Sequence, residues 1–332
     1  MRKIYLIRPI QWVMIFTLFW ISLQATQATT LDVPSSYATI ALAITAATGG
    51  DTIAVAAGTY AENIIINKAL ILQGAGATTT TISGTVVAGS SIITITSPNV
   101  TITGFKITNL SSKYGINVAN QSGISITNNT ITNMGGSNTT TNGNTFGIAV
   151  SSTSAAVADV TITNNIISNI SNANTGSLKS ANGIVIGFST GASDITSLSI
   201  QNNAISNITA GKGAYGILLN HASGVGANTG RTVSPQIKNN TISNLNGLWA
   251  HGIGLEGGTP NAVVQGNTIS TLTLTPSTGT DAAAITLESN ASANTVTIAS
   301  NSFTGVLLGV FNIPSTPANP SVTVGSNWWG CT

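Results

Sequence analysis

The segment ITNNTITNM, from Ile126 to Met134, recurs along the chain with small changes. Each copy has an apolar residue at its first or second position and a second short apolar segment toward its end, and all copies but the one from Ile102 carry a central Asn. Successive central Asn residues are 26 to 38 residues apart, as expected for a solenoid whose loops vary in length. The other copies are ITGFKITNL from Ile102, ITNNIISNI from Ile162, SIQNNAISNI from Ser199, QIKNNTISNL from Gln236, VQGNTISTL from Val264, IASNSFTGV from Ile298 and a shortened VGSNWWG from Val324.

A second recurring segment lies between these copies, so that each repeat holds three short strands. Alternation with period two places Ile116, Ile126 and Ile131 on one face of these strands. Three short strands cannot bury their own apolar face, so successive coils must stack and pair with each other. The sequence predicts an all-β solenoid, with three parallel sheets around a narrow core. The second segment reads YGINV from Tyr114, FGIAV from Phe146, NGIVI from Asn182, YGILL from Tyr215, HGIGL from His251 and AAITL from Ala283.

The central Asn residues have a mechanical role in such a stack. An Asn amide both donates and accepts, so one Asn above another can form a ladder along the inside of a turn. A broken rung would leave a buried amide unpaired, at a cost of about 1–3 kcal/mol. We therefore expect a structural and not a catalytic role for Asn129, Asn165, Asn203, Asn240, Asn267, Asn301 and Asn327.

The composition excludes several classes of protein. Of 332 residues only 5% are charged, and the formal net charge is +2. Three of the ten basic residues precede position 9, which leaves seven basic against eight acidic residues and no basic face for nucleic acid. A positive mean hydropathy of +0.33 excludes a disordered chain. A single Cys excludes a disulfide scaffold.

The N-terminus has the pattern of a Sec signal peptide. Arg2, Lys3 and Arg8 precede an apolar run from Ile10 to Leu23, and small and polar residues follow. The alternative is a membrane anchor, but the run is shorter than the roughly 20 residues of a spanning helix, and no second apolar span follows. We predict a signal peptide over 1–28 with cleavage near Ala28, a single mature domain over 29–332 without a membrane span, and a secreted or cell-surface location.

The passage YATIALAITAATGGDTIAVAAGTYAENIIINKALILQGAG, the Gly-Ile strands and the Asn ladder resemble the right-handed parallel β-helices of the pectin-lyase-like superfamily. The resemblance covers residues from about 31 to 332. It implies a right-handed winding and an N-terminal cap over about 31–50, with a short helix from Tyr37 to Thr48. The segment from Asn327 to Gly330 resembles the last coils of such proteins, where more residues often follow. We therefore expect the chain to be a piece of a longer protein.

Polysaccharide lyases and hydrolases of this superfamily use clustered Asp residues together with Arg, Lys or His. Here no two acidic residues lie within four positions of each other, so no catalytic motif carries over and the sequence favours a non-enzymatic module. The eight acidic residues are Asp32, Asp51, Glu62, Asp159, Asp194, Glu256, Asp281 and Glu288.

One pair of carboxylates keeps an enzymatic alternative open. Aligned Gly-Ile strands place Gly187, Asn220, Glu256 and Glu288 in one outward column, so that the two Glu residues lie about one strand spacing, roughly 5 Å, apart. That separation suits the two carboxylates of a retaining glycosidase. The same pair with Asn220 could bind Ca²⁺, which is the one cofactor that we consider. The alternative is a pair of solvated surface carboxylates.

Two basic residues belong to this alternative. His221 and Arg231 follow the same column and could lie beside the carboxylates, His221 as a third catalytic residue. In contrast, His251 occupies a column with Tyr114, Phe146 and Tyr215, so we predict that it joins an aromatic stack and is not a base.

A third alternative is ice binding, because outward Thr and Ser pairs form part of a flat array. The array covers about three coils and is then interrupted by Gln, Lys and Val, which makes this alternative the weakest of the three. Its regular pairs are Thr101/Thr103, Ser125/Thr127 and Thr161/Thr163.

We therefore expect a secreted or surface β-helix that binds polysaccharide or has a structural, adhesive role. Rows of Asn, Thr and Ser suit sugar hydroxyls, although this expectation rests partly on analogy of fold.

Overall fold

A computed structural model describes residues 27–85, 90–135, 143–172, 179–189, 193–221, 232–256, 258–275, 279, 281–288, 295–313 and 321–330. Within these ranges the side chains of Phe188, Ser189, His221, Glu288 and Ile313 are not described. Most of the predicted signal peptide, residues 1–26, and the predicted site residue Arg231 lie outside the described residues.

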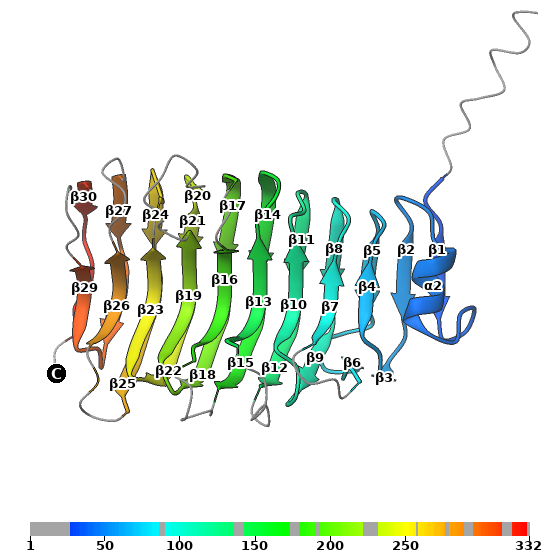
Figure 1. Cartoon of the computed structure of the whole chain (residues 1–332), viewed down its shortest axis with the longest axis horizontal. Helices are drawn as coiled ribbons and strands as arrows, with labels where there is room; N and C mark the ends of the chain where they lie inside the picture. The colour runs from blue at the N-terminus through cyan, green and yellow to red at the C-terminus, as the bar shows by residue number, and fades with distance from the viewer. Residues whose placement is uncertain are drawn as a thin grey trace, which may run out of the picture.

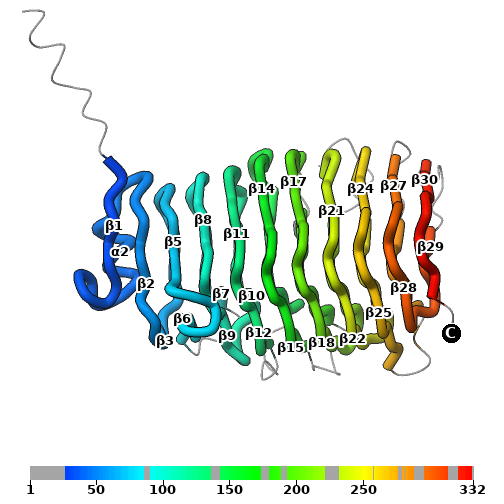
Figure 2. Tube along the Cα trace, turned by 180° about the vertical axis from the view of Figure 1, so that it is seen from behind, coloured from blue at the N-terminus to red at the C-terminus, as the bar shows by residue number. Residues whose placement is uncertain are grey.

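The described chain winds into three parallel sheets that run the length of a rod (Figures 1 and 2). Sheet A holds β1 (Thr30–Val33), β2 (Thr52–Val55), β5 (Ile71–Gly74), β8 (Val100–Thr103), β11 (Ile124–Thr127), β14 (Val157–Thr163), β17 (Ile195–Gln201), β20 (Thr232–Val233), β21 (Gln236–Lys238), β24 (Ala262–Gln265), β27 (Thr295–Ala299) and β30 (Ser321–Val324). Sheet B holds β3 (Gly58–Tyr60), β6 (Thr80–Ile82), β9 (Lys106–Asn109), β12 (Thr130–Met134), β15 (Ile166–Asn172), β18 (Ala204–Ala210), β22 (Thr241–Gly247), β25 (Thr268–Leu274) and β28 (Ser302–Thr304). Sheet C holds β4 (Ile64–Ile66), β7 (Ser91–Ile95), β10 (Tyr114–Ala119), β13 (Thr145–Ser151), β16 (Ala181–Ser189), β19 (Gly213–His221), β23 (Trp249–Glu256), β26 (Asp281–Glu288) and β29 (Leu308–Ile313).

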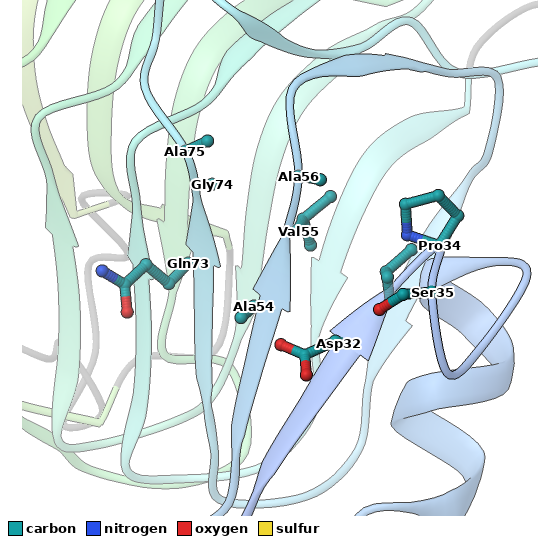
Figure 3. A pocket seen from close by; sticks show the side chains of 10 residues that line it. Asp32, Pro34, Ser35, Ala54, Val55, Ala56, Gln73, Gly74 and Ala75 are labelled. Atoms are coloured by element: carbon teal, nitrogen blue, oxygen red, sulfur yellow. The ribbon is translucent and has the colours of Figure 1, made fainter.

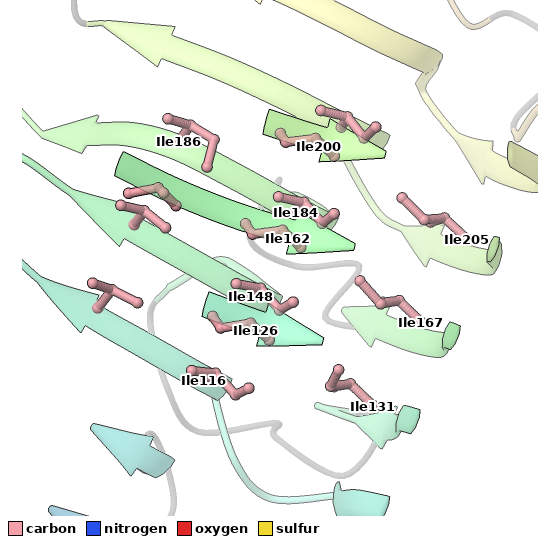
Figure 4. Packing of buried hydrophobic residues seen from close by; sticks show 14 of the residues in the cluster. Ile116, Ile126, Ile131, Ile148, Ile162, Ile167, Ile184, Ile186, Ile200 and Ile205 are labelled. Atoms are coloured by element: carbon pink, nitrogen blue, oxygen red, sulfur yellow. The ribbon is translucent and has the colours of Figure 1, made fainter. Parts of the chain in front are cut away.

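The core consists of columns of inward apolar residues, many of them Ile, contributed by all three sheets. In one coil Ile116, Ile126 and Ile131 point inward from the three sheets and are fully buried (Figure 4). Ile116 pairs with Ile148 on the next coil, and Ile126 pairs with Ile162. The predicted three-sheet solenoid is thus confirmed. Because the branched side chains stack in register, each coil buries its apolar face against the coils above and below.

The turn between sheets A and B explains the Asn pairs of the sequence. The first residue of each pair, such as Asn128 or Asn164, is exposed and has a φ of 56°, in the left-handed region where Asn is tolerated. This conformation turns the chain so that the next residue points into the core. Asn129 and Asn165 are each only 1% exposed. The two Asn residues of a pair therefore have different roles.

The structure brings the seven central Asn residues into one column. In a typical step, Oδ1 of Asn203 accepts from the backbone N–H of Asn165 at 3.0 Å and from its Nδ2 at 3.1 Å. Nδ2 of Asn203 in turn donates to the carbonyl of Ile162 at 2.9 Å and to Oδ1 of Asn240 at 3.0 Å. The same pattern continues to Asn327. Each amide thereby connects three successive coils.

The Gly of each Gly-Ile strand is required by the close approach of sheet C to its neighbours. A Cβ on Gly147 would lie 2.6 Å from the carbonyl oxygen of Gly183 on the next coil and 2.8 Å from Cγ2 of Ile167. The recurring Gly thus permits the strand spacing on which the ladder depends.

The N-terminal end of the rod is closed by helix α2 (Ile40–Ala46), as expected for the cap over 31–50 (Figure 1). The helix is shorter than the predicted Tyr37–Thr48, because the Thr39 side chain caps its N-terminus and accepts from the N–H of Leu42. Ile40 and Ile44 are buried, whereas Leu42 is 54% exposed, since residues two positions apart lie on different sides of a helix.

Two charged side chains from the next coil hold this short helix by its ends. The carboxylate of Glu62 accepts from the N–H groups of Ile40 and Ala41, both at 3.0 Å. Nζ of Lys68 donates to the carbonyls of Thr45 and Ala47, both at 2.7 Å. The negative charge lies at the helix N-terminus and the positive charge at its C-terminus, which complements the helix dipole.

The other end of the rod is partly covered by an aromatic contact. The ring of Trp329 lies 5.2 Å from the ring of Phe303, yet 51% of Trp329 stays exposed. Among the described residues, no helix has the length and apolar character needed to cross a membrane.

The ladder predicts that substitutions at neighbouring residues differ markedly in their effect on the free energy of unfolding. We expect Asn203→Ala to lower the free energy of unfolding by about 1–3 kcal/mol, because it leaves buried donors on Asn165 without an acceptor. Asn202→Gly, at the exposed left-handed position, should change it by less than about 0.5 kcal/mol. Chemical unfolding of both variants measures this; equal losses would contradict the ladder's role.

The cap predicts a specific acid sensitivity. The Asp51 carboxylate accepts from the backbone N–H groups of Thr29 and Thr48, which lowers its pKa from 3.8 to about 2. Its stabilising effect is therefore complete above pH 4 and is lost as the pH falls from about 4 to 2. We expect Asp51→Asn to lower the melting temperature at pH 7 and to flatten this acid limb.

The exposed carboxylate of Asp159 offers the control. Asp159→Asn should keep both the melting temperature and the acid limb, and an unchanged acid limb in Asp51→Asn would refute the assignment.

Candidate functional site

The outward face of sheet C carries a buried aromatic layer. The rings of Tyr114 and Phe146 stack at 4.9 Å with an interplanar angle of 14°. Two coils beyond Phe146, Tyr215 meets the ring of His251 edge-on at 5.2 Å. Phe146, Tyr215 and Leu218 belong to a second hydrophobic cluster that lies outside the main core. The predicted aromatic column is thus present, with His251 in it.

His251 also makes polar contacts that the sequence analysis missed. Its Nε2 lies 2.8 Å from Oδ1 of Asp281, and its Nδ1 lies 3.3 Å from Oγ1 of Thr286. His251 is 2% exposed and Thr286 is fully buried. A carboxylate, an imidazole and a hydroxyl therefore form one hydrogen-bonded chain between β23 and β26.

The burial of these hydrogen-bonded side chains limits the chemistry that they can perform. A carboxylate and a hydroxyl on either side of an imidazole are the parts of a nucleophilic triad. Here the hydroxyl of Thr286 has no exposed surface, so no substrate atom reaches it. The arrangement satisfies buried polar groups and fastens two coils together.

Trp249 extends this cluster toward the surface. Its Nε1 donates to the hydroxyl of Tyr215 at 2.8 Å, and Nζ of Lys212 lies 5.2 Å from the centre of its ring. The ring passes so close to Gly213 that a Cβ there would overlap with Nε1. Trp249 is thus held by a hydrogen bond, a cation–π contact and a neighbour without a side chain.

The backbone pairing aligns three of the four residues of the predicted carboxylate column. Asn220 pairs with Glu256, and Glu256 pairs with Glu288 on the next coil. Gly187 does not belong to this column, because the register between β16 and β19 shifts between Ile186 and Ser189. Asn220 therefore has no paired residue on β16. Glu256 is partly exposed, whereas the side chains of Glu288 and the predicted catalytic His221 lie outside the described set.

The calcium site stays a prediction. In the described part of the chain, no three His, Cys, Asp or Glu side chains gather to hold a metal ion.

The outward face of sheet A carries accessible residues along the whole rod, and most of them are polar. One outward residue of each main strand pairs with its equivalent on the next coil. All members of this column are exposed or half-buried. We call it the outer track; it consists of Asp32, Ala54, Gln73, Thr103, Thr127, Thr163, Gln201, Lys238, Gln265 and Ala299.

A parallel column on the same face contains the predicted Thr and Ser pairs. Thr101, Ser125 and Thr161 are in register, as the ice-binding alternative requires. Gln236 and Val263 interrupt the hydroxyl array farther along.

The contacts of His251 predict that substitutions at His251 and Asp281 have non-additive effects on stability. We expect Asp281→Ala to cost about 1.5–3 kcal/mol, because it leaves a buried imidazole nitrogen without its charged partner. His251→Phe/Asp281→Ala should cost less than the sum of the single changes, since Phe fits the aromatic column and removes the unpaired group. Chemical unfolding of the four proteins measures the coupling, and additive losses would refute it.

Comparison with known proteins gives a limited match in sequence. A cell surface glycoprotein of Methanothermus fervidus is 44% identical over 86 residues, which is 26% of this chain and 14% of that protein. The match thus covers much less than two thirds of the relative's length. No known protein-family profile matches the chain.

Several solved structures share parts of the architecture at low identity. An alginate lyase from Paenibacillus sp. str. FPU-7 is 17% identical with a TM-score of 0.39, over 90% of this chain and 99% of that one. A pectin methylesterase from carrot is 12% identical with a TM-score of 0.39, over 91% and 82%. ORF18 of Geobacillus virus E2 is 13% identical with a TM-score of 0.43, over 86% and 57%.

None of these likenesses bears on chemistry, and the fold is established by the chain's own strand pairing. With three parallel sheets stacked into one solenoid, the described chain has the architecture of a parallel β-helix.

Proposed function

We propose that the protein is a cell-surface β-helix that binds a neutral polysaccharide along the outward face of sheet A. The observation that carries this proposal is the outer track, a continuous row of exposed or half-buried positions in register from β1 to β27. Hydroxyl and amide groups dominate its middle, for instance at Thr127, Thr163 and Gln201.

The chemistry of the track suits sugars. Thr hydroxyls and Gln amides donate and accept hydrogen bonds, as sugar hydroxyls do. Only Asp32 and Lys238 carry charge among the ten track positions, which favours a neutral ligand over an acidic one. Coils repeat at the strand spacing of about 4.8 Å, so equivalent groups recur regularly along the track. A linear polymer of similar repeat length can meet the same contact on successive coils.

The outward face of sheet C is less suitable for this role. Phe146 and Val185 are fully buried there, and Leu218 is 4% exposed. The polar groups of His251 and Thr286 already bond to each other. Sheet A therefore offers the larger set of accessible polar groups.

The location at the cell surface is supported by two findings of different kinds. The relative from Methanothermus fervidus is named a cell surface glycoprotein, although the match covers a small part of it. The N-terminal sequence has the pattern of a signal peptide.

A second candidate is cleavage of a polysaccharide by Glu256 and Glu288. The backbone pairing of these residues on adjacent coils favours it, because one coil spacing of about 4.8 Å approaches the separation in retaining glycosidases. The catalytic assignment requires both carboxylates at the surface, and the calcium site would require the same two groups.

A matched pair of triple variants tests the binding face. In the first, Thr127→Ala, Thr163→Ala and Gln201→Ala remove three polar groups from the track. In the second, Ser168→Ala, Ser206→Ala and Ser243→Ala remove three hydroxyls from a half-buried column of sheet B. We expect the first to weaken retention on the bound polymer at least about tenfold, since each hydrogen bond contributes about 0.5–1.5 kcal/mol.

Retention is measured on immobilised cellulose, xylan, mannan and β-1,3-glucan, and the sheet B variant should bind like the parent protein. Equal loss in both variants, or no retention of the parent on any polymer, would contradict the proposal. Released reducing ends are assayed in the same incubations. Release that disappears in Glu256→Gln/Glu288→Gln would establish the cleaving function instead.

A further inference from the structure

A groove lies on the outward face of sheet A at its N-terminal end (Figure 3). Its volume is about 370 Å³, within the range of small-molecule sites. Ala54, Ala56 and Ala75 form a low floor, because none of them has a side chain beyond Cβ. Asp32 and Gln73 are the outward residues of the two strands that flank β2. The groove is thus hollow where the track positions on either side carry longer side chains.

The groove is the end of the outer track. Asp32, Ala54 and Gln73 are its first three members, and Gln73 pairs with Thr103 of the next coil. Beyond Asp32, sheet A has no further strand among the described residues, since β1 is its edge. Pro34 and Ser35, in the loop from β1 to α2, line the groove on that side. A glycan that follows the track in this direction would therefore contact Pro34 and Ser35 and could not extend beyond them.

The polar groups around the groove are available to a ligand. Within the described structure, the side chains of Asp32, Ser35 and Gln73 make no hydrogen bond to the protein, and Asp32 and Gln73 are exposed. A carboxylate accepts strong hydrogen bonds from neighbouring hydroxyls, and an amide both donates and accepts. Pro34 and the Ala residues offer apolar surface between these groups. Apolar surface edged by hydroxyl-binding groups matches the amphipathic ring of a sugar.

From this geometry we infer that the groove is a terminal subsite, which holds the last glycosyl unit of a neutral glycan whose preceding units lie on the outer track. The inference rests on the proposed function of that track. The subsite gives binding a direction, because one defined end of the glycan lies toward α2. The loop at Pro34 and Ser35 prevents the glycan from extending farther in that direction. A short oligosaccharide depends more on this subsite than a long polymer, which also covers the following coils.

Two Trp substitutions separate the subsite from effects of a bulky side chain elsewhere on the rod. Ala54→Trp fills the groove, while Ser206→Trp places the same side chain on sheet B, away from the outer track; both positions are half-buried. Asp32→Asn keeps the shape and removes the charge. The probes are the linear hexasaccharides of cellulose, xylan, mannan and β-1,3-glucan, titrated calorimetrically into the full chain, together with the immobilised polymers.

We expect Ala54→Trp to raise the Kd of the bound hexasaccharide at least tenfold and to change retention on the polymer less than twofold. Asp32→Asn should raise that Kd at least threefold, and Ser206→Trp should leave it within twofold. An unchanged hexasaccharide Kd in Ala54→Trp, with the parent retained on polymer, would overturn the subsite and leave the proposed function intact. A parent protein that binds neither probe would overturn the proposed function itself.

Discussion

The column of Asn amides is the interaction on which the rest of the structure depends. Each buried amide accepts twice from the preceding coil and donates to the next, so an error of one residue in any coil would leave several polar groups unpaired. The ladder therefore fixes the register of the coils from Asn129 to Asn327 at one corner. With that corner fixed, the Ile residues of the three sheets also pair in register from coil to coil.

Because the register is fixed, the outward faces of sheets C and A have different properties. On sheet C, stacking in register assembles Tyr114, Phe146 and other large side chains into a second apolar layer, in which His251 is accommodated because Asp281 and Thr286 satisfy both of its nitrogens. On sheet A, the same stacking assembles small polar residues into a row that stays accessible. A single mechanical principle thus yields a closed face and a face suited to extended ligands.

Much of the fold could be predicted from the sequence because its causes are local. The Asn pairs recur in four successive coils and the Gly-Ile strands in five, and each has a steric or hydrogen-bonding reason that operates within one turn. The contact of His251 with Asp281 could not be predicted in this way, since it joins residues 30 positions apart on neighbouring coils, with β24 and β25 between them. The register shift that excludes Gly187 from its column, and the groove over Ala54, likewise depend on how particular coils meet.

Hydrogen exchange of the backbone amides at the A–B corner tests the central role of the ladder most directly. The N–H groups of Asn165, Asn203 and Asn240 lie in turns, where exchange is usually fast, but each donates to a buried Oδ1 of the next coil. The account predicts that they exchange as slowly as the central strand amides of the same coils. Exchange as fast as that of solvent-exposed turn amides would show that the coils are held by their apolar faces alone.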